Sequence, residues 1–207
     1  MLAPEWNRRM IILEGTKMTT SRTAILAMLL TMNASVMPSA SYKKAKVSYD
    51  DFKTLVAEVE KHRESRLVDL DTFLKMSKEQ NVIILDARST FRYDRIHVKG
   101  AKNLAFTDFT QDNLAKTIPS PETTVLIYCN NNFEGNQTDF ASKIARPGTG
   151  TLINQFGAQE KPKMMALNIP TYINLYGYGY RNVYELDELV SVSDPRITFE
   201  GTIVTSH

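Results

Sequence analysis

The residue with the clearest chemical potential is the only cysteine of the chain, Cys129, in the stretch IYCNNNFEGN (127–136). It follows the apolar run TTVLIY, which is typical of a buried β-strand, and it precedes a loop rich in asparagine. A thiolate is a strong nucleophile, and its pKa of about 8.5 falls where backbone N–H groups converge on the sulfur. Asparagine and glycine tolerate left-handed backbone conformations, so this loop can present such groups. We therefore predict a reactive thiol at the end of a strand rather than a buried structural cysteine.

Apolar runs alternate with helical patterns along the chain and predict the elements that position this thiol. VIILDAR (82–88) and TTVLIYC (123–129) are continuous apolar runs, which indicate strands buried on both faces of a sheet. Strands alternating with helices predict an α/β fold, with a mainly parallel central sheet and helices on both faces. In such sheets ligands bind beyond the carboxyl ends of the strands, where Cys129 lies.

The helical segments carry boundary signals that the structure can test. We expect a helix after a short strand in RLVDLDTFLKMSKEQN to end near Gln80 or Asn81, and a helix over 107–116 to begin with Thr107 or Asp108 as its N-cap. Pro170 should kink or break the last helix. A helix over 48–62 starts with a capping box and should pack on the domain through apolar residues spaced i, i+3, i+4 and i+7: Phe52, Leu55, Val56 and Val59.

The segment VIILDARSTFRYDRIHVKGAKNLAF (82–106) resembles the rhodanese-domain signature. A strand ends in Asp-x-Arg, formed by Asp86 and Arg88, and a short helix separates it from a His-x-x-Gly-Ala-x-Asn element that contains His97 and Gly100. TTVLIYC is similar to the strand that delivers the rhodanese cysteine, and GYRNVYEL to the final strand of that domain. The similarity covers residues 66–189.

This resemblance implies a sulfurtransferase of the rhodanese superfamily with Cys129 as its catalytic residue. The thiolate would take a sulfane sulfur from a donor such as thiosulfate, hold it as a persulfide and pass it to a thiol or another nucleophile. The partners would be small sulfur compounds or thiol acceptors, with no cofactor, metal or nucleic acid. The implied active-site loop consists of Asn130, Asn131, Asn132, Phe133, Glu134, Gly135 and Asn136. The motif residues Asp86, Arg88, His97 and Gly100 are expected to be structural: the first two as a hydrogen-bonded pair, and His97 by pinning a loop to the sheet.

The chain departs from the family pattern in the loop itself. Rhodaneses carry a basic residue there, whereas this loop has Glu134 and no lysine or arginine before Lys143. An acidic side chain would raise the pKa of the thiol and repel thiosulfate, so we expect a less charged sulfur donor. Arg92 and Arg95 would supply the missing charge if they faced the cysteine; the alternative is a solvated helix face.

Two alternatives to sulfur transfer follow from these departures. The domain can be a catalytically idle rhodanese-like module that binds or senses a ligand or partner. A cysteine phosphatase is excluded, because it needs a basic residue six positions after the cysteine, where Gly135 stands. With three histidines and one cysteine, well separated in the sequence, a zinc site is not expected.

The remaining features concern location and domain organisation. A net charge of +2 gives no indication of a nucleic-acid surface. Basic residues precede the apolar run TAILAMLLTM (23–32), which is followed by small residues, so residues 18–41 have the layout of a signal peptide. The run is shorter than the roughly 20 residues of a membrane span, although an uncleaved anchor or a buried helix are alternatives. We predict an exported, periplasmic protein without a membrane segment after cleavage.

The predicted domain plan has four parts. Residues 1–41 are an upstream extension and signal peptide, 42–65 a linker and helix, 66–189 the rhodanese-like domain, and 190–207 a tail along the surface. A stretch of about 137–163, rich in Gly, Pro, Asn and Gln, is expected to be an insertion between the active-site loop and the last helix. The sequence gives no indication of the oligomeric state.

Overall fold

The computed structural model describes residues 42–146 and 161–204. The predicted signal peptide (18–41) and most of the predicted insertion (147–160) lie outside the described residues. The chain from Lys46 onward forms one compact unit. No helix among the described residues is long and apolar enough to cross a membrane.

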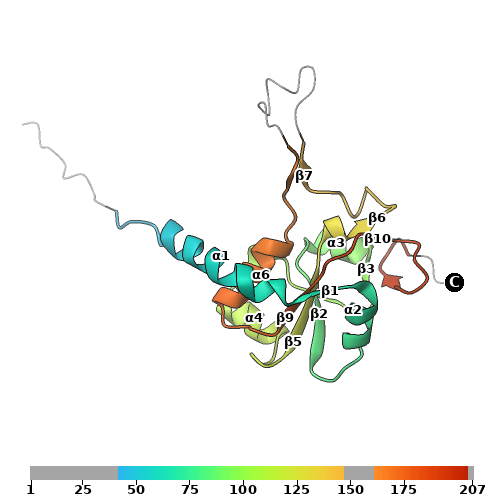
Figure 1. Cartoon of the computed structure of the whole chain (residues 1–207), viewed down its shortest axis with the longest axis horizontal. Coiled ribbons are helices and arrows are strands. Elements are labelled where there is room, and N and C mark those ends of the chain that lie inside the picture. Colours follow the sequence, from blue (N-terminus) through green and yellow to red (C-terminus); the bar gives the residue numbers. More distant parts are fainter. Residues whose placement is uncertain (1–41, 147–160, 205–207) are drawn as a thin grey trace, which may run out of the picture. The chain divides into compact units, whose positions relative to one another are not determined.

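The centre of this unit is a five-stranded parallel sheet, which confirms the predicted fold class (Figure 1). The two long apolar runs pair in the middle of the sheet, with Asp86 in register with Tyr128 at their carboxyl ends. Since the strands are parallel, the residues that follow them meet at one edge. The strand order is β1 (Leu67–Val68), β9 (Val183–Leu186), β5 (Thr124–Tyr128), β2 (Val82–Asp86) and β4 (Lys102–Asn103).

Helices cover both faces of the sheet, as predicted (Figure 1). One apolar core lies between one face of the sheet and helices α1 (Tyr49–Glu64), α4 (Gln111–Thr117) and α6 (Asn168–Gly177). A second core lies on the opposite face, against α2 (Leu70–Met76) and α3 (Thr90–Arg95).

Two helix boundaries differ from the sequence-based prediction. Helix α2 ends at Met76 rather than near Gln80, because the next residues form single turns and Asn81 takes a left-handed conformation (φ 59°). Helix α4 begins after Thr110, whose Oγ1 accepts from the N–H of Asn113. The expected caps, Thr107 and Asp108, instead lie in the preceding 3₁₀ turn.

The predicted kink at Pro170 is also absent, because α6 begins at Asn168 and the proline falls in its first turn. The N–H groups of a first turn have no intrahelical acceptor, so a proline there removes no helical hydrogen bond. The proline therefore helps to start the helix instead of breaking it. Helix α6 therefore begins at Asn168, directly after its N-cap residue Leu167.

Helix α1 packs on the domain with only part of its predicted apolar stripe. Ser48 caps it as predicted, and Val59 is buried against α6, but Phe52 and Val56 near its start are 45% and 40% exposed. The opposite end is fixed to β9 by Arg63, whose Nε and Nη2 donate to the Glu185 carboxylate at 2.5 and 2.8 Å. The helix is therefore anchored at its carboxyl end.

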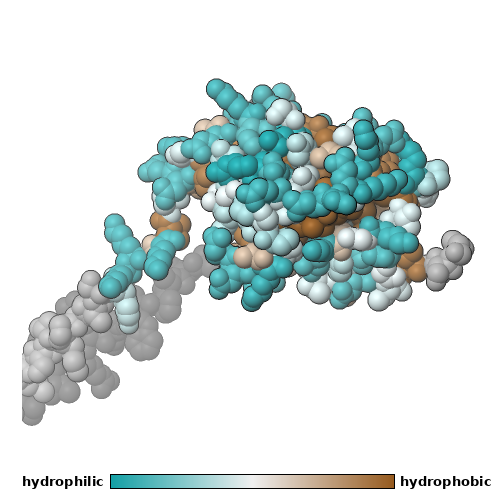
Figure 2. Space-filling view, turned by 90° about the horizontal axis from the view of Figure 1, so that it is seen from below, coloured by the Kyte–Doolittle hydropathy of each residue, from teal (hydrophilic) through white to brown (hydrophobic). Residues whose placement is uncertain are grey.

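The C-terminal tail does more than lie along the surface. Strand β10 (Val190–Ser191) pairs in parallel with β6 (Phe133–Glu134), and β11 (Phe199–Glu200) pairs antiparallel with β3 (His97–Val98). Val190 and Ile197 are buried in the second core. The tail thus completes that core, while the outer surface remains mainly hydrophilic with apolar residues between polar ones on the face seen in Figure 2.

The second core makes a direct stability prediction. Phe73 on α2 is completely buried, whereas Phe91 on α3 is 65% exposed. Phe73→Ala should lower the free energy of unfolding by about 3–5 kcal/mol, because it removes a buried ring and leaves a cavity. Phe91→Ala is the matched control and should change it by less than about 0.5 kcal/mol. Urea unfolding followed by circular dichroism measures both; equal losses would show that the core is packed differently.

Candidate active site

Cys129 lies directly after β5, at the carboxyl end of the central sheet, and its side chain is buried (2% exposed). The backbone N–H of Leu167, at the start of α6, donates to its Sγ at 3.4 Å, and the N–H of Asn130 also points to it. The prediction that this thiol is not buried was wrong. The thiol is buried because the residues at the start of α6 cover its sulfur, although Leu167 is 38 positions from Cys129 in the sequence.

The electrostatics of the thiol are a balance between burial and these N–H groups. Burial is the largest effect and raises the pKa of Cys129; the N–H groups of Leu167 and Asn130 lower it, but by less. The result is a pKa above the usual value, so the thiol is neutral at pH 7. Glu134, suspected from the sequence, is exposed on β6 and is not among the causes.

The predicted active-site loop does not form a continuous cradle around the sulfur. Asn130–Asn132 form a 3₁₀ turn beside Cys129, but Phe133 then enters the second core and is fully buried. Gly135 has a φ of 91°, and a Cβ there would meet the side chain of Val192 at 3.1 Å. The loop therefore leaves the cysteine after three residues.

Asn132 holds the remaining short turn in place. Its Oδ1 accepts from the N–H of Cys129 and from Nδ2 of Asn168, both at 2.9 Å. Its Nδ2 donates to the carbonyl groups of Leu186 (2.6 Å) and Glu188 (3.2 Å). One buried amide thus joins the ends of β5 and β9 to the start of α6.

The other loop asparagines have separate roles. Asn131 pairs with the backbone of Lys143, donating to its carbonyl at 3.2 Å and accepting from its N–H at 2.7 Å. Asn136 lies beside Asp139, away from the turn, and accepts from its N–H at 3.1 Å. Asn130 is buried, and its Oδ1 has no partner among the described residues. Only Asn130–Asn132 therefore remain candidates for a role at the sulfur.

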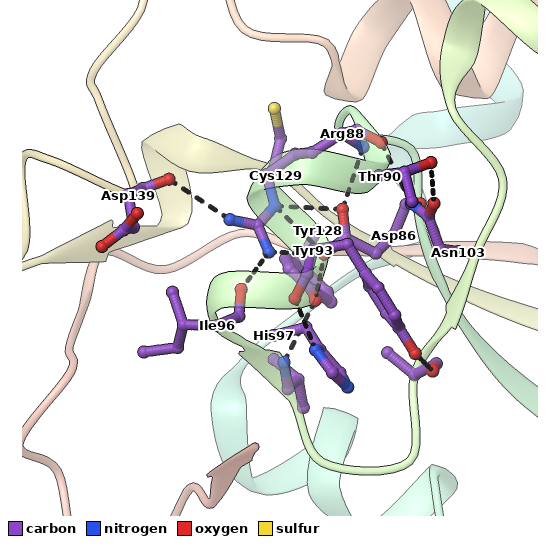
Figure 3. A network of polar contacts seen from close by, with 12 residues as sticks. Asp86, Arg88, Thr90, Tyr93, Ile96, His97, Asn103, Tyr128, Cys129 and Asp139 are labelled. Atoms are coloured by element: carbon purple, nitrogen blue, oxygen red, sulfur yellow. Dashed lines mark hydrogen bonds and ion pairs between the residues drawn. The ribbon is translucent and has the colours of Figure 1, made fainter. Parts of the chain in front are cut away.

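Asp86 and Arg88 form a buried ion pair beneath the cysteine (Figure 3). Arg88 donates to both carboxylate oxygens of Asp86, with its Nη2 at 2.6 Å from Oδ2, and also to the carbonyl of Ile96 at 2.6 Å. The hydroxyl of Tyr128 donates to the same carboxylate at 2.6 Å. Because every strong polar group is paired, this network supports the ends of β2 and β5 rather than presenting a free charge to the thiol.

Arg92 and Arg95 do not provide the positive charge missing from the loop. Both bond to Asp139: Nε of Arg95 lies 2.5 Å from Oδ1, and Arg92 also donates to the carbonyl of Thr138. Arg95 is the main reason why the pKa of Asp139 is lowered. Asp139 was not predicted, since it lies in a segment without helix or strand periodicity.

His97 and Gly100 are fixed by a second residue that the sequence did not indicate, Glu200. The Nε2 of His97 lies 3.2 Å from its Oε1, and the N–H of Gly100 donates to the same oxygen at 2.9 Å. The Nδ1 of His97 bonds to the carbonyl of Tyr93 at 2.7 Å, and the two rings stack. These contacts hold the β3 turn, and neither ring nitrogen is directed at Cys129.

A cavity of about 430 Å³ lies at the same edge of the sheet as the cysteine, between the 3₁₀ turn, the start of α6 and the end of β9, although Cys129 is not one of its described lining residues. Asn132 and Asn168 line it, and Leu167, the donor to the sulfur, is the residue before Asn168. No group of three metal-ligating side chains occurs in the described part of the chain. The volume and lining of the cavity suit a small organic ligand.

A family model, described as the rhodanese-like domain, matches residues 69–188, more than half of the chain. The chain belongs to the rhodanese-like domain family. The predicted resemblance is confirmed, with boundaries close to those read from the sequence. Cys129 lies within the matched region.

Solved structures similar to this chain include the following two. The BH2092 protein from Bacillus halodurans is 16% identical, over 73% of this chain and 88% of that one, with a TM-score of 0.36. A Cys-to-Ser variant of EanB in complex with hercynine is 17% identical, over 58% of this chain but only 23% of that one, with a TM-score of 0.35. No curated protein matches the chain. The activity must therefore be inferred from the residues of this rhodanese-like domain.

The buried ion pair predicts a stability difference between two arginines. Arg88→Met should cost about 3–5 kcal/mol of unfolding free energy, because it leaves the Asp86 carboxylate buried without its partner. Arg196→Met removes an arginine that is also ion-paired, to Asp194 and Asp71, but is 51% exposed. It should cost much less. Urea unfolding compares the two; a loss in Arg196→Met as large as in Arg88→Met would contradict the assigned role of burial.

The raised pKa of Cys129 predicts slow alkylation at neutral pH. Only the thiolate reacts with iodoacetamide, so the rate should be low at pH 7 and still rising above pH 9. The same chain unfolded in guanidinium is the control, and its thiol should titrate with a pKa of about 8.5. Mass spectrometry measures the rates; a plateau reached below pH 8 in the folded protein would show that the N–H groups outweigh burial.

Proposed function

We propose that this rhodanese-like domain is a sulfur carrier, in which Cys129 accepts a sulfane sulfur as a persulfide and passes it to a thiol. The observation that carries the proposal is the convergence of two backbone N–H groups, of Leu167 and Asn130, on the sulfur at the carboxyl end of the central strand. Such donors stabilise a thiolate or persulfide more than a neutral thiol. Family membership supports the same reaction class.

The reaction needs no external oxidant. The Cys129 thiolate attacks the outer sulfur of a donor persulfide R–S–SH, forming a new S–S bond. The bond between that sulfur and the donor's inner sulfur breaks, and R–S⁻ leaves with the electron pair. In the second half, an acceptor thiolate attacks the outer sulfur of Cys129–S–SH, and the Cys129 thiolate is restored. Protons lost when the thiols ionise pass to solvent.

The charge around the site favours donors other than thiosulfate. Arg88 lies below the sulfur and is occupied by Asp86. The described walls of the nearby cavity carry three carboxylates and one arginine. A dianion such as thiosulfate would therefore gain little attraction on approach and would meet like charge. An alkyl persulfide carries at most one negative charge and meets less of this repulsion.

A second candidate function is a binding or sensing module without turnover. The burial of Cys129 and its raised pKa favour it, because burial disfavours the thiolate and so makes the nucleophile scarce. In that case the cavity would bind a ligand or partner, and the thiol would serve only as packing. The two functions differ in one measurable property, the formation of a persulfide.

We also propose that the protein works after export, with small sulfur compounds or thiols as its partners. The signal-peptide layout of residues 18–41 supports this location. A single cysteine cannot form an internal disulfide, so the thiol would remain available there.

An intact-mass experiment tests the sulfur-carrier function. The protein is incubated at pH 8.5 with an alkyl persulfide, which carries at most one negative charge, or with the dianion thiosulfate, and then desalted. We expect a gain of one sulfur atom from the alkyl persulfide, at least about tenfold faster than from thiosulfate, and its loss after addition of a small thiol. Cys129→Ser is the control and should gain none. Absence of any gain up to pH 9.5 would favour the module without turnover.

A further inference from the structure

The cavity next to the turn that follows Cys129 has an uneven charge. Among its described lining residues Arg63 is the only cation, whereas Glu185, Asp187 and Glu188 carry carboxylates. Lys143 and Lys163 adjoin lining residues in sequence, but neither lines the cavity. The described walls of the cavity therefore have an excess of negative charge.

The single cation is already neutralised. Arg63 makes a two-pronged ion pair with Glu185, which is 4% exposed, and this pair fixes α1 to β9. Glu188 receives the N–H of Leu70 at 2.8 Å but has no ion-pair partner among the described residues. Asp187 likewise forms no ion pair within the described part of the chain. The carboxylates of Asp187 and Glu188 thus remain available to a positively charged ligand.

A second and independent observation points to a ligand with a hydrogen-bond donor. Asn168 lines the cavity and is only 7% exposed. Its Nδ2 donates to Asn132, but its Oδ1 has no partner among the described residues. A buried acceptor without a donor is unfavourable, and native proteins rarely keep one unless something binds to it. An N–H group of a ligand would satisfy this oxygen.

The other walls of the cavity suit an apolar group. Met164, Ile169 and Leu189 line it and are all more than half exposed, and Ile144 lies on the short strand β7 (Ile144–Ala145). Large apolar side chains exposed around a hollow with a few polar groups are typical of a small-molecule site. A ligand that buries them would gain hydrophobic free energy.

From these features we propose that the cavity binds a small organic ammonium compound. Its N–H group donates to Oδ1 of Asn168, its positive charge lies near Asp187 and Glu188, and its apolar part covers Met164, Ile169 and Leu189. The cavity is the site for the carbon skeleton of a sulfur donor or acceptor only if the proposed sulfur-carrier function is correct. Binding of an ammonium compound to the cavity does not depend on that function.

A set of three probes of similar size and different charge tests this proposal: benzylamine, which is protonated at pH 7, benzyl alcohol and phenylacetate. Titrations of the ¹⁵N-labelled full chain are followed by NMR at the side-chain amide of Asn168 and the backbone N–H groups of Asn131 and Ile169. We expect benzylamine to shift these signals and to bind at least about tenfold more tightly than phenylacetate, with benzyl alcohol between them. The preference should weaken in high salt.

Two variants locate the charge that matters. Asp187→Asn should weaken benzylamine binding about two- to fivefold, and its combination with Glu188→Gln should weaken it further. Asp112→Asn makes the same chemical change on α4, at an exposed residue that does not line the cavity, and should leave the affinity unchanged. The proposal is overturned if benzylamine causes no shifts, if phenylacetate binds equally well, or if Asp112→Asn weakens binding as much as Asp187→Asn.

Cys129→Ser separates this result from the sulfur-carrier function. The variant carries no sulfur but should bind benzylamine as the parent protein does. Benzylamine binding without persulfide formation supports the cavity and contradicts the carrier. A persulfide without benzylamine binding supports the carrier and contradicts the cavity.

Discussion

The site depends on the hydrogen bonds of one buried amide, Asn132. It accepts from Cys129 and Asn168 and donates to the carbonyl groups of Leu186 and Glu188, so two strand ends and a helix start meet at one side chain. An amide can do this because it offers acceptor and donor atoms in one rigid plane. Removing it would leave several buried backbone groups unpaired at once, which is why the turn, α6 and the cavity belong to one structural unit.

The position of α6 decides the chemistry of the thiol. In a continuous rhodanese loop, the residues after the cysteine would lead directly into the helix; here Phe133 enters the core, and the described part of the chain returns to the sulfur at Leu167. The helix start brings an N–H group to the thiol but also covers it. Covering removes water from both forms of the sulfur and penalises the charged form most, so the pKa rises despite the donors. The same helix thus supplies stabilising donors and the desolvation that outweighs them.

The sequence was sufficient where the signal was local. The apolar runs at 82–88 and 123–129, the cap at Ser48 and the Asp-x-Arg spacing each depend on neighbouring residues, and the structure has the corresponding strands, cap and ion pair. Sequence-based prediction failed where residues far apart in the sequence contact one another in the fold. Neither the burial of Cys129 by residues near 167 nor the bonds of Glu200 to His97 and Gly100 leaves a periodic pattern in sequence. The pairing of Asp139 with Arg92 and Arg95 was missed for the same reason.

The substrate preference therefore cannot be read from the loop alone. Glu134 suggested repulsion of anions, but its side chain is exposed at the end of β6, and it is not among the causes of the raised pKa of the thiol. The negative charge near the site comes instead from Glu185, Asp187 and Glu188, at the end of β9 and just after it. Because these residues lie at the end of a parallel strand next to β5, sheet order rather than loop sequence places them on the cavity at the edge of the sheet where Cys129 also lies. The argument from Glu134 also predicted negative charge near the site, but only the fold identifies the side chains that carry this charge.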